Sequence, residues 1–303
     1  MVAAGNPIDP QQSVSWQRGR MRFGNVNGRG AAIVDGRVVD IERMSDGRFG
    51  SDPAVYADLA HHDVLRALVD AATPAQWPEL DDSTLGPPVP RPSKTFAVGV
   101  NYRAHAVETG RELPTEPHFF AKTQNCLTGP FGEIDLPQGL GQVDFEAELV
   151  VVFGRTCKNV AAGEAWSHIA GVMCGQDVSD RFEQRRPPLK QFTVAKSYDT
   201  FGPTGPFLVT PDELADRNAL PIRCTVSGEV MQDSNTDDLI FDVPALVAWL
   251  SRYITFSVGD LVWTGTPGGV GEARDPQRFL RNGDVVETTI GGVGVMRNRV
   301  TQR

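Results

Sequence analysis

Three acidic residues alternate with apolar ones along one short segment of the chain: Asp144, Glu146 and Glu148. Side chains two positions apart on a strand lie on the same face, so the three carboxylates are expected to point the same way. That face continues as Val150 and Val152, which places the acids at the mouth of a buried region. Crowded carboxylates repel one another, and a divalent cation would relieve the repulsion. The alternative is a solvated strand edge.

A further acid, Asp177, follows a second predicted strand over residues 169–174. It could join a metal site or cap a helix. Two carboxylates from one strand and one from another would leave about three positions of an octahedral ion for water and substrate. Ligands that are all oxygens favour Mg²⁺ or Mn²⁺, with Ca²⁺ as another occupant, over zinc.

A candidate acid–base pair follows the strand predicted over residues 96–100. His105 and Glu108 are three positions apart, so they are neighbours if the segment is helical. A carboxylate beside a histidine orients the ring and raises its basicity, which suits it to take a proton from water. The alternative is a surface contact of little energetic value.

Lys196 interrupts a run of apolar and small residues, so its ammonium needs an anionic partner. That partner is either a substrate carboxylate or enolate, or one of the acids. Residues 264–271 are rich in glycine, which lets backbone N–H groups approach an anion. The chain lacks a GxGxxG ahead of a helix, a GK[ST] and a GxSxG, which argues against a nucleotide site and a serine hydrolase.

The composition is that of an ordinary folded protein and is compatible with small-molecule chemistry. Of 303 residues, 40% are hydrophobic and 22% are charged, and the net charge of −9 argues against a nucleic-acid partner. No apolar stretch is long enough for a membrane span, and the start does not resemble a signal peptide, so a cytoplasmic protein is expected. The four cysteines are widely spaced, which predicts buried, reduced thiols.

The chain divides at a proline-rich stretch, residues 86–93. We expect a flexible tail over residues 1–20, a small α+β domain over 21–85 that begins with a β-meander, the linker, and a catalytic domain over 94–303. The overall class is mixed, β-dominated α+β. Helices are expected over residues 163–169 and 243–253, and strands over residues 96–100, 148–153, 171–174, 207–209, 223–226, 261–263 and 285–290.

Taken together, several segments over residues 96–300 resemble the fumarylacetoacetate hydrolase family, in the branch of acylpyruvate hydrolases and 2-hydroxyhepta-2,4-diene-1,7-dioate isomerases. They appear in the family's order: VGVNYRAHAVE, FFAKTQN, DFEAELVVVFG, GQDVSDR, AKSYDTFGPTGPFLV, NTDDLIFDVPALVAWLS, GDLVWTGTPGGVG and NGDVVETTIGGVG. The resemblance implies a β-rich, barrel-like core and a homodimer.

The resemblance also implies roles for particular residues. Mg²⁺ or Mn²⁺ would be held by Glu146, Glu148 and Asp177. The water-activating dyad would be His105 and Glu108, in a segment that can close over the site. The remaining roles are contact with the substrate or intermediate for Lys196, with the substrate carboxylate for Thr266, proximity to the metal for Arg181, and further substrate contacts for Tyr102 and Gly265.

One segment departs from the family pattern. The family commonly has DVSARD, whereas this chain has DVSDRF, with Asp180 in place of a small residue and Phe182 in place of an acid. Arg181 is kept. Phe182 and the Arg185–Arg186 pair could therefore line a distinct pocket, which leaves the substrate open.

The function implied is hydrolysis of a carbon–carbon bond in a β-diketo or 2,4-dioxo (acylpyruvate-type) acid, as in aromatic catabolism. Alternatives on the same site are decarboxylation of oxaloacetate-like acids and isomerisation of unsaturated dioic acids, because fold and site do not determine the reaction. A more distant alternative is a non-enzymatic protein that binds a structural cation.

Overall fold

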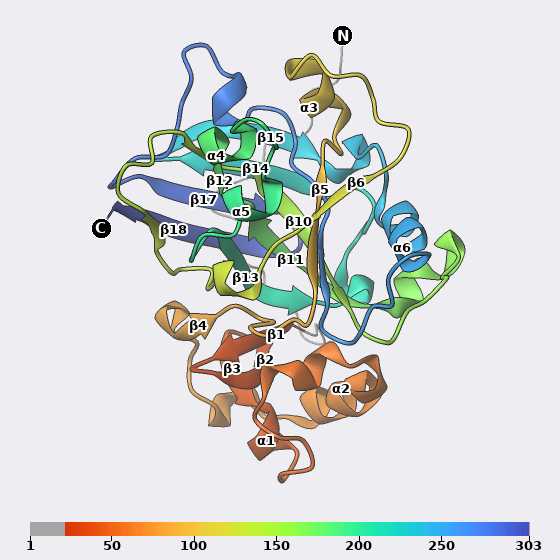
Figure 1. Cartoon of the computed structure of the whole chain (residues 1–303). Helices are drawn as coiled ribbons and strands as arrows, with labels where there is room; N and C mark the ends of the chain where they lie inside the picture. Colours follow the sequence, from red (N-terminus) through yellow and green to blue (C-terminus); the bar gives the residue numbers. More distant parts are fainter. Residues whose placement is uncertain (1–21, 303) are drawn as a thin grey trace.

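A single eleven-stranded sheet runs through the computed structural model, which describes residues 22–302 (Figure 1). The predicted tail, residues 1–20, lies outside the described residues. Along the sheet the order is β3 (Arg37–Asp40), β2 (Arg29–Val34), β1 (Arg22–Val26), β13 (Gly202–Val209), β11 (Ile169–Gln176), β10 (Ala147–Phe153), β16 (Leu261–Trp263), β5 (Thr95–Gly99) and β6 (His118–Ala121), with β4 (Leu85–Gly86) on β1 and β7 (Leu127–Thr128) on β13.

A second sheet packs against one face of the first. Its order is β15 (Glu229–Asn235), β14 (Pro221–Val226), β17 (Val285–Ile290), β18 (Gly294–Gln302) and β8 (Ile134–Leu136). The strand-rich, mixed class predicted from the sequence is confirmed. The barrel-like core is an open pair of sheets, because β3 and β6 end the large sheet without pairing to each other anywhere in residues 22–302.

β10 is buried on both faces, which explains its continuous apolar run. Val151 packs in the core between the two sheets, with residues of β14 and β17. Val150 and Val152 face the other way, into a second core that includes Leu65 and Val69 of α2 (His62–Ala71). Alternate side chains of β10 therefore point into two different cores. Glu148 lies on the same face as Val150 and Val152.

The N-terminal segment extends the large sheet. β1, β2 and β3 form the predicted meander, with tight turns at Asn27–Gly28 and Asp35–Gly36 where all four residues have positive φ. β1 pairs with β13, so strands from the two predicted domains share one sheet (Figure 1). The division at residues 86–93 stays a prediction. After the meander, residues 53–71 form two 3₁₀ turns followed by α2.

The remaining elements are short and surround the sheets. The helix predicted over residues 163–169 is a 3₁₀ turn. The four cysteines are free and buried, as predicted. No helix among residues 22–302 is long and apolar enough to cross a membrane. The helices are α1 (Ile41–Met44), α3 (Arg103–Glu108), α4 (Arg181–Arg185), α5 (Phe192–Ala195) and α6 (Val243–Ser251), and β9 (Val143–Asp144) pairs with β12 (Ser179–Asp180). The 3₁₀ turns are Pro53–Ala57, Leu59–His61, Pro74–Gln76, Asp82–Thr84, Gln124–Cys126, Ala162–His168, Pro211–Glu213, Thr236–Asp238 and Gly271–Ala273.

Candidate active site

Three buried carboxylates converge where β10 and β11 meet. One oxygen from each of Glu146, Glu148 and Asp177 lies within 4.8 Å of the others, and all three residues are buried. Sheet pairing accounts for this convergence, because Ala147 is opposite Gln176 and the backbone N–H of Asp177 donates to the carbonyl of Glu146 at 2.8 Å. The structure thus brings together the acids that the sequence selected as metal ligands.

Asp144 lies apart from this cluster, which corrects the single strand predicted through all three alternating acids. The chain leaves extended pairing between β9 and β10, so Asp144 turns toward Arg181, whose Nε donates to it at 2.9 Å. Its oxygens also accept from the backbone N–H groups of Gly271 at 2.7 Å and Glu272 at 3.0 Å. Asp144 is therefore an anchor for Arg181 and for the glycine-rich loop.

Two buried lysines lie against the carboxylate cluster. The Nζ of Lys196 donates to Glu146 Oε2 at 2.6 Å and to Asp177 Oδ2 at 2.7 Å, so the predicted anionic partner is found among the acids. The Nζ of Lys122, a residue that the sequence analysis did not select, donates to Asp177 Oδ1 at 2.6 Å. Burial opposes the charge on Lys122, but Asp177, Cys126 and Glu148 together outweigh burial and raise the pKa of this lysine.

The two glutamates have opposite electrostatic surroundings. Burial disfavours ionised Glu146, yet Lys196 and Arg181 outweigh it and lower its pKa to about 2. The pKa of Glu148 is raised well above its ordinary value by burial, and also by Asp177 and Glu146. No lysine or arginine within the described residues forms an ion pair with Glu148. Three buried carboxylates with one left unpaired by any side-chain cation are a donor set that suits a hard divalent ion.

The metal-free protein is expected to lose stability as the pH rises through the raised pKa of Glu148. The folded state holds this proton more tightly than the unfolded chain, whose glutamates titrate near pH 4.3, so the stabilisation is complete below about pH 4.3 and is lost above the folded pKa. The lowered pKa of Glu146 changes the stability only in the acid range, where the stabilisation is lost as the pH falls from about 4.3 to about 2. Thermal unfolding of chelator-treated protein against pH tests this, with Glu148→Gln as the variant that should lack the decline.

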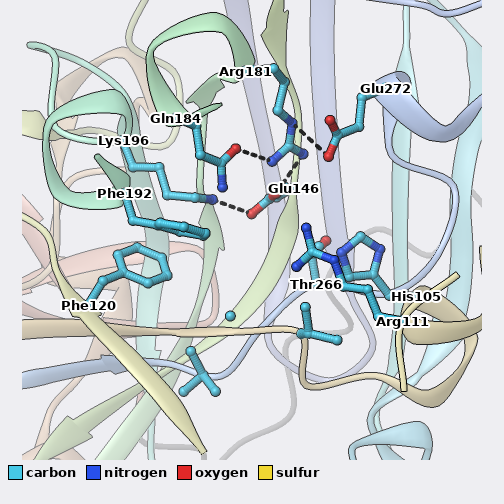
Figure 2. A pocket seen from close by; sticks show the side chains of 13 residues that line it. His105, Arg111, Phe120, Glu146, Arg181, Gln184, Phe192, Lys196, Thr266 and Glu272 are labelled. Carbon is cyan, nitrogen blue, oxygen red and sulfur yellow. Dashed lines mark hydrogen bonds and ion pairs between the residues drawn. The ribbon is translucent and has the colours of Figure 1, made fainter. Parts of the chain in front are cut away.

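The predicted His105–Glu108 pair forms on α3. His105 Nδ1 lies 2.7 Å from Glu108 Oε1, and Glu108 Oε2 accepts from the backbone N–H of Gly269 at 2.7 Å. His105 is buried, and its ring borders the pocket that Glu146 and Thr266 also line (Figure 2). The arrangement orients the imidazole through Nδ1 and leaves its other nitrogen for a ligand in the pocket.

The pocket combines cationic and aromatic side chains. Arg111, Arg181 and Lys196 supply the cations, and Phe120 and Phe192 form the apolar wall (Figure 2). The side chain of Arg111, from the loop after α3, extends toward the centre of the pocket. This chemistry suits an anionic ligand with a small apolar portion.

Arg181 is held by protein groups on several sides. Besides Asp144, it contacts Glu146 Oε1 at 2.6 Å through Nη2, and its Nη1 donates to Gln184 Oε1 at 3.0 Å. Gln184 and Glu272 line the pocket but were not selected from the sequence, because each has charged neighbours along the chain and no pattern distinguishes it from them. Gln184 could have been found only from its spacing, because it lies three positions after Arg181 and therefore on the same face of α4.

The residues that depart from the family pattern have separate surroundings. The side chain of Asp180 caps α4 by accepting from the backbone N–H of Phe182 at 3.1 Å. Phe182 itself is 63% exposed, so it does not line this pocket. Arg185 forms an ion pair with Glu272 on the pocket wall, whereas Arg186 pairs with Glu183 at 3.3 Å. Of these residues, Arg185 alone approaches the pocket through a contact to its lining.

The glycine-rich loop uses its amides to hold protein carboxylates. Gly265 N–H donates to Glu148 Oε2 at 2.8 Å, so the anion that this amide binds is a carboxylate of the protein itself. Thr266 lines the pocket, and its hydroxyl accepts from Gln232 Nε2 at 2.8 Å. Tyr102 is fully buried, and its hydroxyl has no hydrogen-bond partner within residues 22–302.

Comparison with known proteins identifies the family. The family model described as fumarylacetoacetate (FAA) hydrolase C-terminal matches residues 94–301. A mitochondrial oxaloacetate tautomerase from Homo sapiens is 44% identical over 244 residues, which cover 80% of this chain and 78% of the relative. A 2,4-didehydro-3-deoxy-L-rhamnonate hydrolase from Sphingomonas sp. is 44% identical over 218 residues, which cover 72% of this chain and 76% of the relative.

A solved structure with a similar fold contains a bound metal. It is maleylpyruvate hydrolase from Sphingobium sp. SYK-6 in complex with manganese(II) and pyruvate. It is 30% identical, with a TM-score of 0.78, and the match covers 93% of this chain and 99% of that one. The similarity supports a divalent metal in this family of enzymes and leaves the choice between magnesium and manganese open.

Proposed function

Because the chain belongs to the fumarylacetoacetate hydrolase family, we propose that it is a divalent-metal-dependent hydrolase that cleaves a carbon–carbon bond in a 2,4-dioxo acid. The observation that carries the proposal is that His105, paired with Glu108, lines the same pocket as Glu146, one of the three clustered carboxylates. Glu146, Glu148 and Asp177 would hold Mg²⁺ or Mn²⁺, and the bound ion would supply Lewis-acid polarisation of a carbonyl group.

In the proposed reaction, the chain's own residues move the proton and hold the charges. His105, oriented by Glu108, accepts a proton from water as the water oxygen bonds to the C4 carbonyl carbon. The bond between C3 and C4 then breaks, its electron pair forms the pyruvate enolate, and C3 takes up the proton that His105 accepted from water, which gives pyruvate and regenerates the base. Lys196 stabilises the developing negative charge, and its ammonium is already directed at the site by Glu146.

The remaining predicted substrate contacts are part of the same proposal. Thr266 and Arg181 line the pocket and are in position to meet a ligand's oxygens. Gly265, whose N–H donates to Glu148, and the buried Tyr102 are the other proposed substrate contacts. The homodimer, the cytoplasmic location and a place in aromatic catabolism also stay proposals.

A second candidate is keto–enol tautomerisation of oxaloacetate. The observation that favours it is the 44% identity to the human oxaloacetate tautomerase over most of both chains. The same His105 would transfer a proton at carbon instead of activating water, and no carbon–carbon bond would break. Decarboxylation of oxaloacetate-like acids and isomerisation of unsaturated dioic acids use the same enolate chemistry and are the other outcomes to test.

Product identification separates these reactions. Acetylpyruvate, a fumarylpyruvate-type acid, oxaloacetate and an unsaturated dioic acid are assayed with Mg²⁺, with Mn²⁺ and with a chelator. Hydrolysis gives two acids, decarboxylation gives carbon dioxide, and tautomerisation or isomerisation leaves the mass unchanged. We expect acid products from a 2,4-dioxo acid and loss of turnover on chelation. A metal-dependent change in thermal stability without turnover of any of them would instead indicate a non-enzymatic cation-binding protein.

A further inference from the structure

Lys122 is completely enclosed by protein groups behind the carboxylate cluster. Its side chain is 0% exposed, and it lies outside the group of residues that line the pocket. Its Nζ donates to Asp177 Oδ1 at 2.6 Å, to the carbonyl of Phe201 at 3.2 Å and to the carbonyl of Lys196. An ammonium has three donors, so these three acceptors satisfy it fully. A lysine in this state has no proton donor left for a ligand.

The two oxygens of Asp177 are divided between two lysines. Oδ1 accepts from Lys122, while Oδ2 accepts from Lys196 at 2.7 Å. Lys196 also reaches Glu146 Oε2 at 2.6 Å, so Oδ2 is the Asp177 oxygen that lies on the side of Glu146. Lys196 lines the pocket and Lys122 does not. Lys122 therefore withholds one oxygen of Asp177 from the space between the carboxylates.

The surroundings of Lys122 leave its ammonium little freedom to move. It follows β6 directly, and its backbone N–H donates to the carbonyl of Thr95 on β5 at 3.0 Å. The ammonium lies 5.2 Å from the centre of the Trp263 ring, and Trp263 is fully buried on β16. Contacts with the neighbouring strands β5 and β16 therefore fix Lys122, and Lys122 in turn positions Asp177.

We propose that Lys122 is a positioning residue that keeps Asp177 a single-oxygen ligand and so makes the site prefer small octahedral ions to Ca²⁺. The inference rests on the proposed metal-binding function. Mg²⁺ requires near-octahedral geometry, whereas Ca²⁺ takes more oxygens and accepts carboxylates through both of theirs. Removing Lys122 frees Oδ1 and allows two-oxygen binding by Asp177.

The test measures ion selectivity, not turnover. Metal-free wild type and Lys122→Met are titrated calorimetrically with Mg²⁺, Mn²⁺ and Ca²⁺. Groups that orient metal ligands typically change metal affinity by about 10- to 100-fold, so we expect the preference for Mg²⁺ over Ca²⁺ to fall by at least about tenfold. Lys158→Met is the matched control, since Lys158 is exposed and its Nζ donates only to the carbonyl of Arg252 among the described residues.

The outcomes separate this inference from the proposed function. A purely structural role for Lys122 would lower the thermal stability of the variant and leave the ion preference within about twofold of wild type, which overturns the inference alone. Failure of wild type to bind any of the three ions overturns both. If Lys122→Met does not fold, a crystal structure of the Ca²⁺-loaded wild type decides. Asp177 Oδ1 is expected to stay on Lys122, and an ion bound through both oxygens would refute the proposal.

Discussion

Glu148→Gln is expected to weaken binding of Mg²⁺ and Mn²⁺ by more than about 100-fold, because it removes a direct ligand, and the effect should exceed that of losing a group that only orients one. Turnover should fall with it. The fold should not suffer, because Gln keeps the shape and can still accept the N–H of Gly265. In the metal-free protein the substitution also removes repulsion from Glu146 and Asp177. Calorimetric titration with each ion, together with thermal unfolding in a chelator, measures both parts.

The control for this substitution is Glu164→Gln, which makes the same change at an exposed residue of the 3₁₀ turn Ala162–His168. It should leave metal affinity at the wild-type value. Undiminished affinity in Glu148→Gln would mean that the three carboxylates do not form the metal site. A large loss of stability in the chelated variant would mean that Glu148 is chiefly structural.

His105→Gln is expected to lower kcat by about 10²- to 10⁴-fold, the usual contribution of a general base, while metal affinity stays unchanged. The ring lines the pocket but is not one of the clustered carboxylate ligands, so proton transfer is lost and the ion is kept. Glu108→Gln should have a smaller effect, because it weakens the orientation of the ring but leaves the base in place. Steady-state kinetics at saturating metal, with the substrate that the product assays select, provide the comparison.

His168→Gln is the matched control for the histidine. His168 ends the 3₁₀ turn before β11, and its carbonyl accepts from Gly154, just beyond the end of β10 farthest from Glu148. Its kcat should equal that of wild type. Full activity in His105→Gln with intact metal binding would remove water activation by this residue and leave a reaction driven by the metal and Lys196.

Local patterns in the sequence predicted the parts of the site that depend on neighbours along the chain. The alternation of Glu146 and Glu148 with apolar residues sufficed to place both on one face, because strand geometry repeats every two residues. The spacing of His105 and Glu108 predicted their contact for the equivalent reason in a helix, and the pair forms with a 2.7 Å separation. The N-terminal meander was also predicted, and its tight turns form at Asn27-Gly28 and Asp35-Gly36, residue pairs that readily adopt positive φ.

The same rules failed where the chain changes conformation within a few residues. Asp144 shares the parity of Glu146, but the strand is interrupted between β9 and β10, so its carboxylate binds Arg181. The glycine-rich loop was predicted to receive an anion, and its amides do so, but the anions include Glu148 and Glu108 from other elements. The glycine-rich composition indicated that these amides can bind an anion, but it did not indicate which anion they bind.

The sequence by itself thus determined which reactive groups the protein contains: acids in alternation, a histidine near a glutamate, and a lysine among apolar residues. Tertiary structure alone decided which of these groups meet. Lys122 has no charged neighbour along the chain, and it reaches Asp177, 55 residues away, only because β6 and β11 belong to one sheet. The physical reason is that backbone periodicity acts over a few residues, whereas the pairing of distant strands depends on how the whole chain buries its apolar faces.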